Sequence, residues 1–229
     1  MPESSQPEHS RIWRVPTSTW FRLDVDKRDR VLHAAMREFG EHGYSTGSLN
    51  NIARDAEIAK GSLFQYFSDK QEFFAYVCDE TSRRIREEME RRMAGLDLDQ
   101  PFIDWLTDVC FVWSEYFAEH PLERGVTAAT NFEIDNSVRA VVRDTAGQHY
   151  LQVVRPVLHL WRDKGEIRAD ADDDVLVSLL LLILPFIAMA PYYDGIDPVL
   201  GLRGRTPVEQ RPAIRRFVAG LGPIFEPPR

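Results

Sequence analysis

Residues 48–74 read SLNNIARDAEIAKGSLFQYFSDKQEFF, and this stretch decides the fold of the chain. Ser48 is suited to cap a first short helix, because the apolar residues that follow it recur at helical spacing. A second short apolar set lies in residues 63–67, and the small and hydrogen-bonding residues around it suit a helix that enters a DNA groove. Ser68 and Gln71 have the spacing of a capping box, which predicts the start of a further helix. The stretch therefore has the layout of a helix-turn-helix DNA-binding unit.

A wider pattern extends outward from this stretch, from about Asp26 to Phe74. It consists of an apolar helix, a glycine-aromatic corner, an Ile-Ala pair, and a Lys-Gly-Ser-Leu-Phe run followed closely by Tyr-Phe. The residues that carry it are Leu32, Ala35, Phe39, Gly43, Tyr44, Ser48, Ile52, Ala53, Lys60, Gly61, Ser62, Leu63, Phe64, Tyr66, Phe67, Lys70 and Phe74. In this register the sequence resembles the TetR family of bacterial transcriptional repressors. The resemblance implies a sequence-specific DNA-binding regulator, with repression as the default.

The resemblance also assigns the residues that contact DNA. It places on the DNA-reading helix Lys60, Gly61, Ser62, Gln65 and Tyr66, and beside it, as phosphate contacts, Ser48 and Lys70. Gln65 is suited to an adenine edge, because its amide both donates and accepts hydrogen bonds. For Tyr66 a place in the core is the alternative, and for Lys70 a solvated charge at a helix end. The neighbouring Leu63, Phe64 and Phe67 are assigned to the core.

Two residues depart from the family pattern. Glu57 stands where the family usually has glycine in the turn, and Ala59 stands where it usually has Ser or Thr before the lysine. A non-glycine residue forced to positive φ costs roughly 1 kcal/mol, and a lost helix cap costs about as much. We therefore expect the DNA-reading helix to be set slightly differently, or to be less rigid in the free protein, without loss of the motif.

Charge is divided unevenly along the chain. The formal net charge of −8 at pH 7 is unfavourable for DNA binding when taken as a whole. Residues 11–70, however, carry ten Lys and Arg against eight Asp and Glu, whereas residues 71–229 carry eighteen against twenty-six. The N-terminal third is therefore the part that suits a polyanion.

Little in the sequence indicates chemistry beyond binding. Cys78 and Cys110 lie far apart and outside any CxxC pattern, so neither a disulfide framework nor a zinc site is expected, and a reducing cytoplasm fits. The first ten residues lack the pattern of a secretory signal. The histidines form no i,i+4 pair, and the acidic cluster at 170–174 is expected to be a solvated helix start, so no metal ligand is predicted. Because no nucleophile elbow, Walker loop or dinucleotide fingerprint occurs, we expect neither enzyme activity nor a cofactor.

Residues 175–190, VLVSLLLLILPFIAMA, are apolar on every face of a helix. A membrane-spanning helix needs about 20 such residues, and this run is shorter, contains Pro185 and follows the acidic cluster. We therefore predict a fully buried helix in a large core or interface, and no membrane association.

Periodicity and turn signals divide the chain into three parts. Residues 1–23 are predicted to form an N-terminal arm, residues 24–70 the DNA-binding domain, and residues 71–229 a ligand-binding and dimerisation domain. For the end of the arm three interpretations stay open: packing of Trp20, Phe21 and Leu23 against the first helix, disorder, or DNA contacts from Arg11, Arg14 and Arg22. Helices are expected over residues 27–42, 69–93, 101–120, 138–164, 175–190 and 207–221. No strand-like alternation occurs, so the predicted fold class is all-α.

In the larger domain the resemblance implies a cavity for a small hydrophobic effector, and a homodimer formed by the last two long helices. Residues of the aromatic-rich middle are candidates to line the cavity, namely Trp105, Trp113 and Phe117 with Tyr116 and Phe132 nearby. Polar residues among them are candidates to orient a ligand, namely Thr127, Asn131 and His149. For each of these residues, ordinary core packing is the alternative.

The expected function is a cytoplasmic, homodimeric regulator that binds a palindromic operator in double-stranded DNA and is released by the effector. Within regulation, the alternatives are an activator and a regulator without a small-molecule ligand. Outside it, the alternative is an α-helical binding protein for small molecules whose DNA-binding unit is vestigial.

Overall fold

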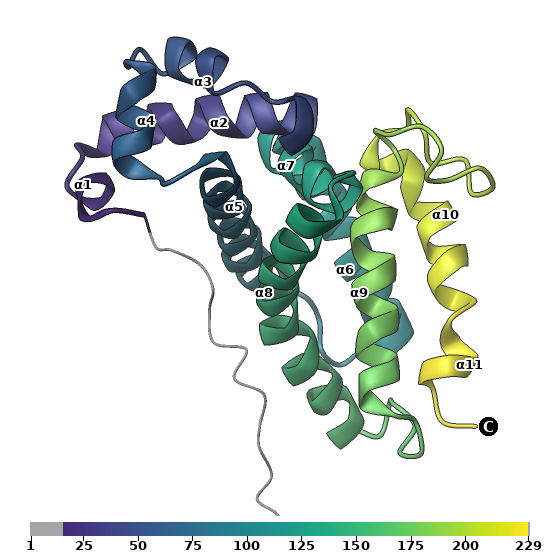
Figure 1. Ribbon diagram of the computed structural model, residues 1–229. Helices are drawn as coiled ribbons and strands as arrows, with labels where there is room; N and C mark the ends of the chain where they lie inside the picture. The colour runs from purple at the N-terminus through teal and green to yellow at the C-terminus, as the bar shows by residue number, and fades with distance from the viewer. Residues whose placement is uncertain (1–15, 229) are drawn as a thin grey trace, which may run out of the picture.

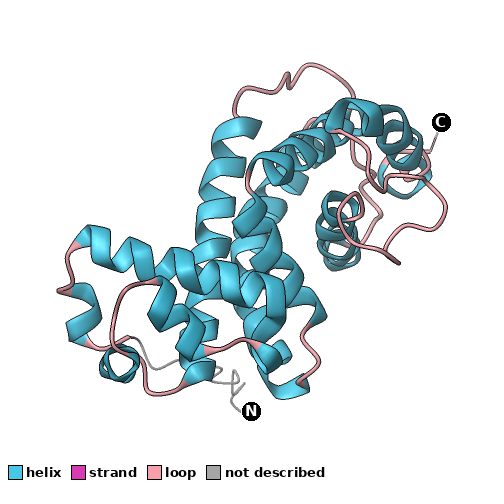
Figure 2. Ribbon diagram, turned by 90° about the horizontal axis from the view of Figure 1, so that it is seen from above, coloured by secondary structure: helices cyan, strands magenta, loops and turns pink. Residues whose placement is uncertain are grey.

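The computed structural model describes residues 16–228, which fold into eleven α-helices without a strand in this part of the chain (Figure 1). Figure 2 shows the same arrangement from above, as helices joined by loops. The all-α fold class is therefore confirmed. Arg11 and Arg14 of the predicted arm lie outside the described residues.

A short helix, α1 (Ser18–Phe21), comes first, and then α2 (Val25–Thr46), α3 (Leu49–Asp55), α4 (Lys60–Tyr66) and the long connecting helix α5 (Lys70–Met93) follow the predicted order. The remaining helices are α6 (Phe102–Glu119), α7 (Pro121–Phe132), α8 (Asn136–Asp163), α9 (Asp173–Met189), α10 (Pro207–Ala219) and α11 (Gly222–Phe225). Of these, α7 and the short α1 and α11 are not among the predicted helices.

Local signals explain where α2 ends and α5 begins. Regular helical geometry in α2 is interrupted at Gly43, whose φ of 68° lies in the left-handed region that glycine tolerates, as expected for a C-terminal glycine. The start of α5 differs from the prediction by one residue. Asp69, not Ser68, is the cap: its carboxylate accepts from Glu72 N at 2.8 Å, and the Glu72 carboxylate accepts from Ser68 N. The helix start thus uses an acidic pair, which also suits the positive end of the helix.

Trp20 in α1 is fully buried, as the packing alternative expects, but its aromatic neighbours belong to the end of α4 and to α5 and not to the predicted first helix. Its indole ring lies 5.1 Å from the Phe67 ring and 5.5 Å from the Tyr76 ring. The next residue, Phe21, is 53% exposed and takes no part in this packing. Helix α1 therefore covers the small core formed by α2–α5.

Helix α7 packs closely along α2 and extends the N-terminal core. A Cβ on Gly40 of α2 would lie 3.1 Å from the carbonyl carbon of Gly125 in α7, so the absence of side chains allows the two backbones to approach. Val126 and Ala129 of α7 belong to the same buried cluster as the residues of α2–α5. A second cluster fills the larger part of the molecule, where α6 packs against α9 and α10, and α8 against α5 and α9.

Residues 175–190 are helical as predicted, but α9 is not buried all round. Leu180 and Leu184 enter the second cluster, whereas Val175 is 61% and Leu182 60% exposed. The reason is that α6, α7 and α8 cover only one side of α9 within a single chain. No helix within residues 16–228 is long and apolar enough to span a membrane.

Candidate DNA-binding helices and ligand cavity

A buried glutamate fixes the start of α3. Ser48 caps the helix, with its hydroxyl oxygen accepting from Asn51 N at 3.4 Å. The backbone N–H of Ser48 donates to Glu38 Oε1 of α2 at 2.8 Å, and the Asn51 amide donates to both Glu38 oxygens at 3.3 Å. Because Glu38 is only 8% exposed, these bonds hold α3 in one orientation on α2.

The turn between α3 and α4 contains both departures from the family pattern. Glu57 has a φ of 56°, in the region where glycine would be unstrained. Ala59 occupies the cap position of α4 and, as expected, provides no side-chain hydrogen bond. The helix therefore begins with backbone N–H groups that no cap satisfies.

Helix α4 divides into a buried face and an exposed face. Lys60, Gly61 and Gln65 are exposed, and a Cβ added at Gly61 would meet no atom within 4 Å. Ser62 is half-buried, and Leu63 lies in the core.

Phe64, which was assigned to the core, is instead 51% exposed. Its position one turn after Lys60 and Gly61 places it with the exposed residues, because the apolar set of this short helix has more members than one face can bury.

Tyr66 lies in the core, which was the alternative to a DNA contact for this residue. It is 3% exposed, and its ring centroid lies 5.7 Å from that of Trp20. Thr17 ties the chain before α1 to the end of α4: its hydroxyl donates to the Gln65 carbonyl at 2.7 Å and its N–H to the Tyr66 carbonyl at 2.9 Å. Thr17 therefore holds the C-terminal end of α4 in place. No pattern in the sequence predicts this role.

Lys70 begins α5, next to the helix-turn-helix. Its ammonium nitrogen lies 4.8 Å from the centre of the Tyr44 ring. Burial lowers the pKa of Lys70, although the carboxylates of Glu133 and Glu38 act in the opposite direction. Lys70 is half-buried, with its charge held close to the end of α2.

Glu133, directly after α7, is a further residue of this region that the sequence analysis missed. Its carboxylate accepts hydrogen bonds from the Ser45 hydroxyl and, at 3.0 Å, from Asp135 N. Burial alone would raise the pKa of Glu133, but the hydrogen bonds from Ser45, Asp135 and Tyr44 outweigh it and hold the pKa below its ordinary value. The ionised carboxylate therefore joins the end of α7 to the corner that precedes α3.

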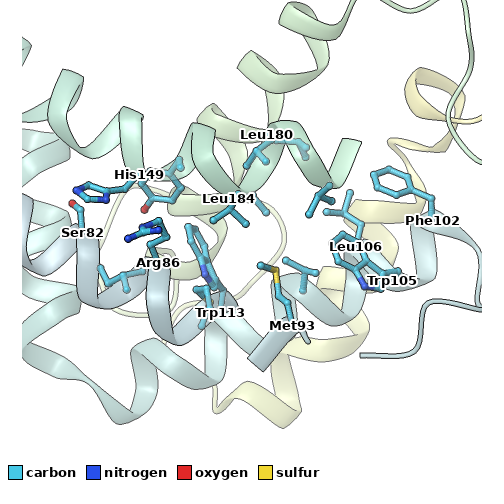
Figure 3. A pocket seen from close by; sticks show the side chains of 17 residues that line it. Ser82, Arg86, Met93, Phe102, Trp105, Leu106, Trp113, His149, Leu180 and Leu184 are labelled. Atoms are coloured by element: carbon cyan, nitrogen blue, oxygen red, sulfur yellow. The ribbon is translucent and has the colours of Figure 1, made fainter. Parts of the chain in front are cut away.

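The second cluster contains a cavity enclosed by α5, α6, α8 and α9 (Figure 3). About 60 Å³ of the cavity is open to the centre of a water molecule, and the space between its atoms is about 670 Å³ when the open mouth is counted. The lining residues are Ser82, Ile85, Arg86, Met89, Met93, Phe102, Trp105, Leu106, Val109, Trp113, His149, Tyr150, Val153, Val154, Val157, Leu180 and Leu184. The lining is largely apolar, with a few polar side chains, which is the composition of a small-molecule site.

Three of the six predicted ligand residues line this cavity, namely Trp105, Trp113 and His149. Phe117 is buried behind it, with its ring 6.0 Å from that of Trp113. The other two, Thr127 and Asn131, do not line the cavity and form hydrogen bonds within α7 and to α8.

Thr127 donates its hydroxyl proton to the Glu123 carbonyl at 2.8 Å, and Asn131 donates to the Thr127 carbonyl at 2.7 Å and accepts from Arg143. Their hydrogen bonds are thus used in holding α7 and α8. Among the polar lining residues, the sequence analysis missed Ser82 and Arg86 of α5 and Tyr150 of α8. Ser82 and Arg86 lie in the charged second half of α5, which has the pattern of a solvated helix.

Known proteins resemble this chain in sequence and in fold. The profile of the bacterial regulatory proteins of the tetR family matches residues 31–77. The HTH-type transcriptional repressor AcnR of Corynebacterium diphtheriae is 31% identical over 185 residues, which cover 77% of this chain and 88% of AcnR. AcnR of Corynebacterium glutamicum is 26% identical over 187 residues, which cover 78% and 90% of the two chains. The structure of the fatty acid degradation regulator FadR from Bacillus halodurans shares the fold, with a TM-score of 0.66, 17% identity, and coverage of 87% and 98%.

Proposed function

Because the chain belongs to the TetR family of bacterial transcriptional regulators, we propose that it is a repressor that binds a palindromic operator as a homodimer. Residues 24–70 form its DNA-binding domain, and residues 71–229 bind a small hydrophobic effector and the second subunit. Entry of the effector into the cavity releases the repressor from the operator.

One observation carries the DNA-binding assignment: the division of α4 into two faces. Leu63 and Tyr66 attach the helix to the core, while Lys60, Gly61 and Gln65 remain exposed. A helix so attached offers an outer face to the major groove, with Lys60 near phosphates and Gln65 near base edges. The open space around Gly61 supports a close approach of the backbone to DNA.

The dimer assignment is supported by the exposed side of α9. Val175 and Leu182 lie two turns apart on one face of the helix, and each is more than half exposed in the single chain. Large apolar side chains gathered on one exposed helix face favour an interface. A dimer places two DNA-reading helices at half-sites about 34–36 Å apart, which a palindromic operator matches.

Helix α5 supports the coupling of effector to operator. It begins at Lys70, beside the helix-turn-helix, and its second half carries Arg86, Met89 and Met93 into the cavity wall. Figure 1 shows α5 leaving the N-terminal helices and running beside α8. A ligand that displaces this wall moves the helix on which the DNA-binding unit rests.

Two binding measurements test the proposal. Genomic fragments protected by the protein should contain an inverted repeat, and binding to that repeat should survive an excess of unrelated DNA. Effector binding, followed by Trp105 and Trp113 fluorescence, should be weaker in the presence of operator, and operator binding weaker by the same factor in the presence of effector. Equal effector affinities with and without operator would favour a ligand-independent regulator. Transcription that rises when the protein occupies its site would identify an activator. If the protein showed no selective DNA binding, its DNA-binding unit would be vestigial.

A further inference from the structure

Helix α5 carries five arginines, and Arg86 is bonded differently from the others. The residues that hydrogen-bond glutamate carboxylates are Arg83, Arg84, Arg91 and Arg92. Arg86 forms only longer ion pairs, with Nη1 3.6 Å from Glu90 and Nη2 3.8 Å from Glu87, and its Nε is buried without a partner. A buried donor without an acceptor is costly, so Arg86 retains hydrogen-bonding capacity that its neighbours have used.

Arg86 meets other polar groups at one end of the cavity. Figure 3 shows its guanidinium there together with Ser82 and the His149 ring. His149 Nε2 lies 2.8 Å from Asp79 Oδ1, which orients the ring, while Nδ1 is buried without a partner. Tyr150 also lines the cavity, and burial raises its pKa, so the phenol keeps its proton and can donate it in a hydrogen bond.

The opposite end of the cavity is apolar. Phe102, Trp105 and Leu106 lie there, with Met93 and Trp113 nearer the middle (Figure 3). Within the described part of the chain, neither Asp nor Glu lines the cavity. A cationic ligand would therefore lose its hydration without gaining a counter-charge, whereas an anionic head has Arg86.

We propose that the effector is an amphipathic organic acid, whose carboxylate binds Arg86 and whose apolar body lies along Trp105 and Met93. This inference rests on the proposed function in taking the cavity as the effector site. The guanidinium offers paired N–H groups that match the two oxygens of a carboxylate. Ser82 and His149 border the same head group. Because Arg86 belongs to α5, the acid acts directly on the helix that adjoins the DNA-binding unit.

The test compares acids with neutral molecules of the same shape. The full-length protein is titrated separately with dodecanoate and with 1-dodecanol, and then with 2-naphthoate and with 2-naphthamide. The fluorescence of Trp105 and Trp113 is the signal in each titration. A charge-assisted hydrogen bond in a partly buried site corresponds to roughly tenfold or more in affinity, so at least one acid should exceed its neutral partner by that factor. Arg86→Gln should abolish the difference, with the larger loss of affinity for the acid.

Arg83→Gln is the matched control, because Arg83 lies on the same helix, pairs with Glu80 and Glu87, and does not line the cavity. It should keep the preference for the acid. If neither acid binds better than its neutral partner, or if Arg86→Gln keeps the preference, the inference is wrong. Operator binding, measured in the same preparations, separates this failure from that of the proposed function. If the protein binds operator but shows no preference for acids, only the inference about the effector is wrong. If it prefers acids but binds no operator, the proposed function as a repressor is wrong.

Discussion

The backbone N–H of Tyr44 donates a hydrogen bond of 2.8 Å to Glu133 Oε2, although the two residues are 89 positions apart. Tyr44 follows the Gly43 kink near the end of α2, and Glu133 follows the last residue of α7. Helix α7 in turn packs against α8, which borders the cavity. The bond therefore joins the end of α7, a neighbour of the cavity helix α8, to the corner that leads into α3.

Glu133→Gln should weaken this link. An amide keeps the shape of the carboxylate but replaces one acceptor oxygen by a donor, which leaves one of the N–H or O–H groups from Tyr44, Ser45 and Asp135 without an acceptor. We expect a loss of about 1–3 kcal/mol in the free energy of unfolding, measured by urea denaturation. Glu115→Gln on α6, which removes a carboxylate without a hydrogen bond to the protein, is the control and should change little. Equal stability of the two variants would contradict the role of Glu133.

The same carboxylate predicts a pH dependence. The folded-state pKa of Glu133 lies below the ordinary value of 4.5, so the ionised form is favoured by folding. Its contribution to stability is present above pH 4.5 and is lost as the pH falls through the folded-state pKa. Between pH 6 and acid pH, wild-type protein should therefore lose more stability than Glu133→Gln. Parallel curves for the two proteins would mean that Glu133 does not contribute.

Ala59→Ser should stabilise the DNA-reading helix. Ala59 has φ −70° and ψ 138°, a geometry that a capping serine adopts, and α4 has no side-chain cap. The serine hydroxyl can accept from a free N–H of the first turn, which is worth about 1 kcal/mol. We expect a higher free energy of unfolding and slower amide exchange in α4. The wild-type protein, in which Ala59 supplies no hydroxyl, is the comparison, and a serine variant no more stable than the wild type would contradict the missing cap.

Leu182→Glu should separate the subunits. The side chain is 60% exposed in the single chain, so a charge there is tolerated by the monomer but would be buried without a partner in a dimer through α9. Sedimentation should show a folded monomer that binds operator weakly. Leu98→Glu provides the control, because Leu98 is 41% exposed and belongs to the loop after α5 and not to α9. A wild-type monomer, or a dimeric Leu182→Glu protein, would rule out this interface.

Lys60→Ala should weaken binding to every DNA sequence. If Lys60 neutralises a phosphate in each half-site, its loss flattens the plot of log affinity against log salt by about 0.9 for each contact, hence roughly 1.8 for the dimer. Lys164→Ala removes the same charge from the C-terminal part of α8 and should leave the slope unchanged. An unaltered slope in Lys60→Ala would place the lysine away from the phosphates.

Apolar periodicity predicts most long helices of this fold, because each buries large side chains at helical spacing. It does not predict α7, whose buried residues include Gly125, Ala128 and Ala129. Gly125 is the residue that allows α7 to approach α2 near Gly40. A helix contact made through glycine and alanine leaves no strong apolar signal in one sequence, although Pro121 is suited to the first turn of a helix.

The two candidate sites differ in how far a single sequence reveals them. The predicted DNA-binding residues lie within one short stretch, so local spacing and resemblance are sufficient to propose them, although they do not show that Tyr66 is buried. The cavity brings together four helices, and Arg86 lies in a run of charged residues where only its missing hydrogen bond distinguishes it from its neighbours. Aromatic content locates Trp105 and Trp113, but it selects Phe117 equally, because periodicity does not separate a cavity wall from the core behind it.

Selection of binding sites from a pool of random DNA duplexes tests the central claim most directly. The wild-type protein should enrich an inverted repeat whose half-site centres are one helical turn, or a multiple of it, apart. Gln65→Ala should enrich the same repeat with preference lost at one symmetric pair of positions, a loss of about 1–3 kcal/mol per half-site if the contact is bidentate. Enrichment of no sequence by the wild-type dimer, or an identical preference in Gln65→Ala at every position, would contradict the assignment of α4 as the DNA-reading helix.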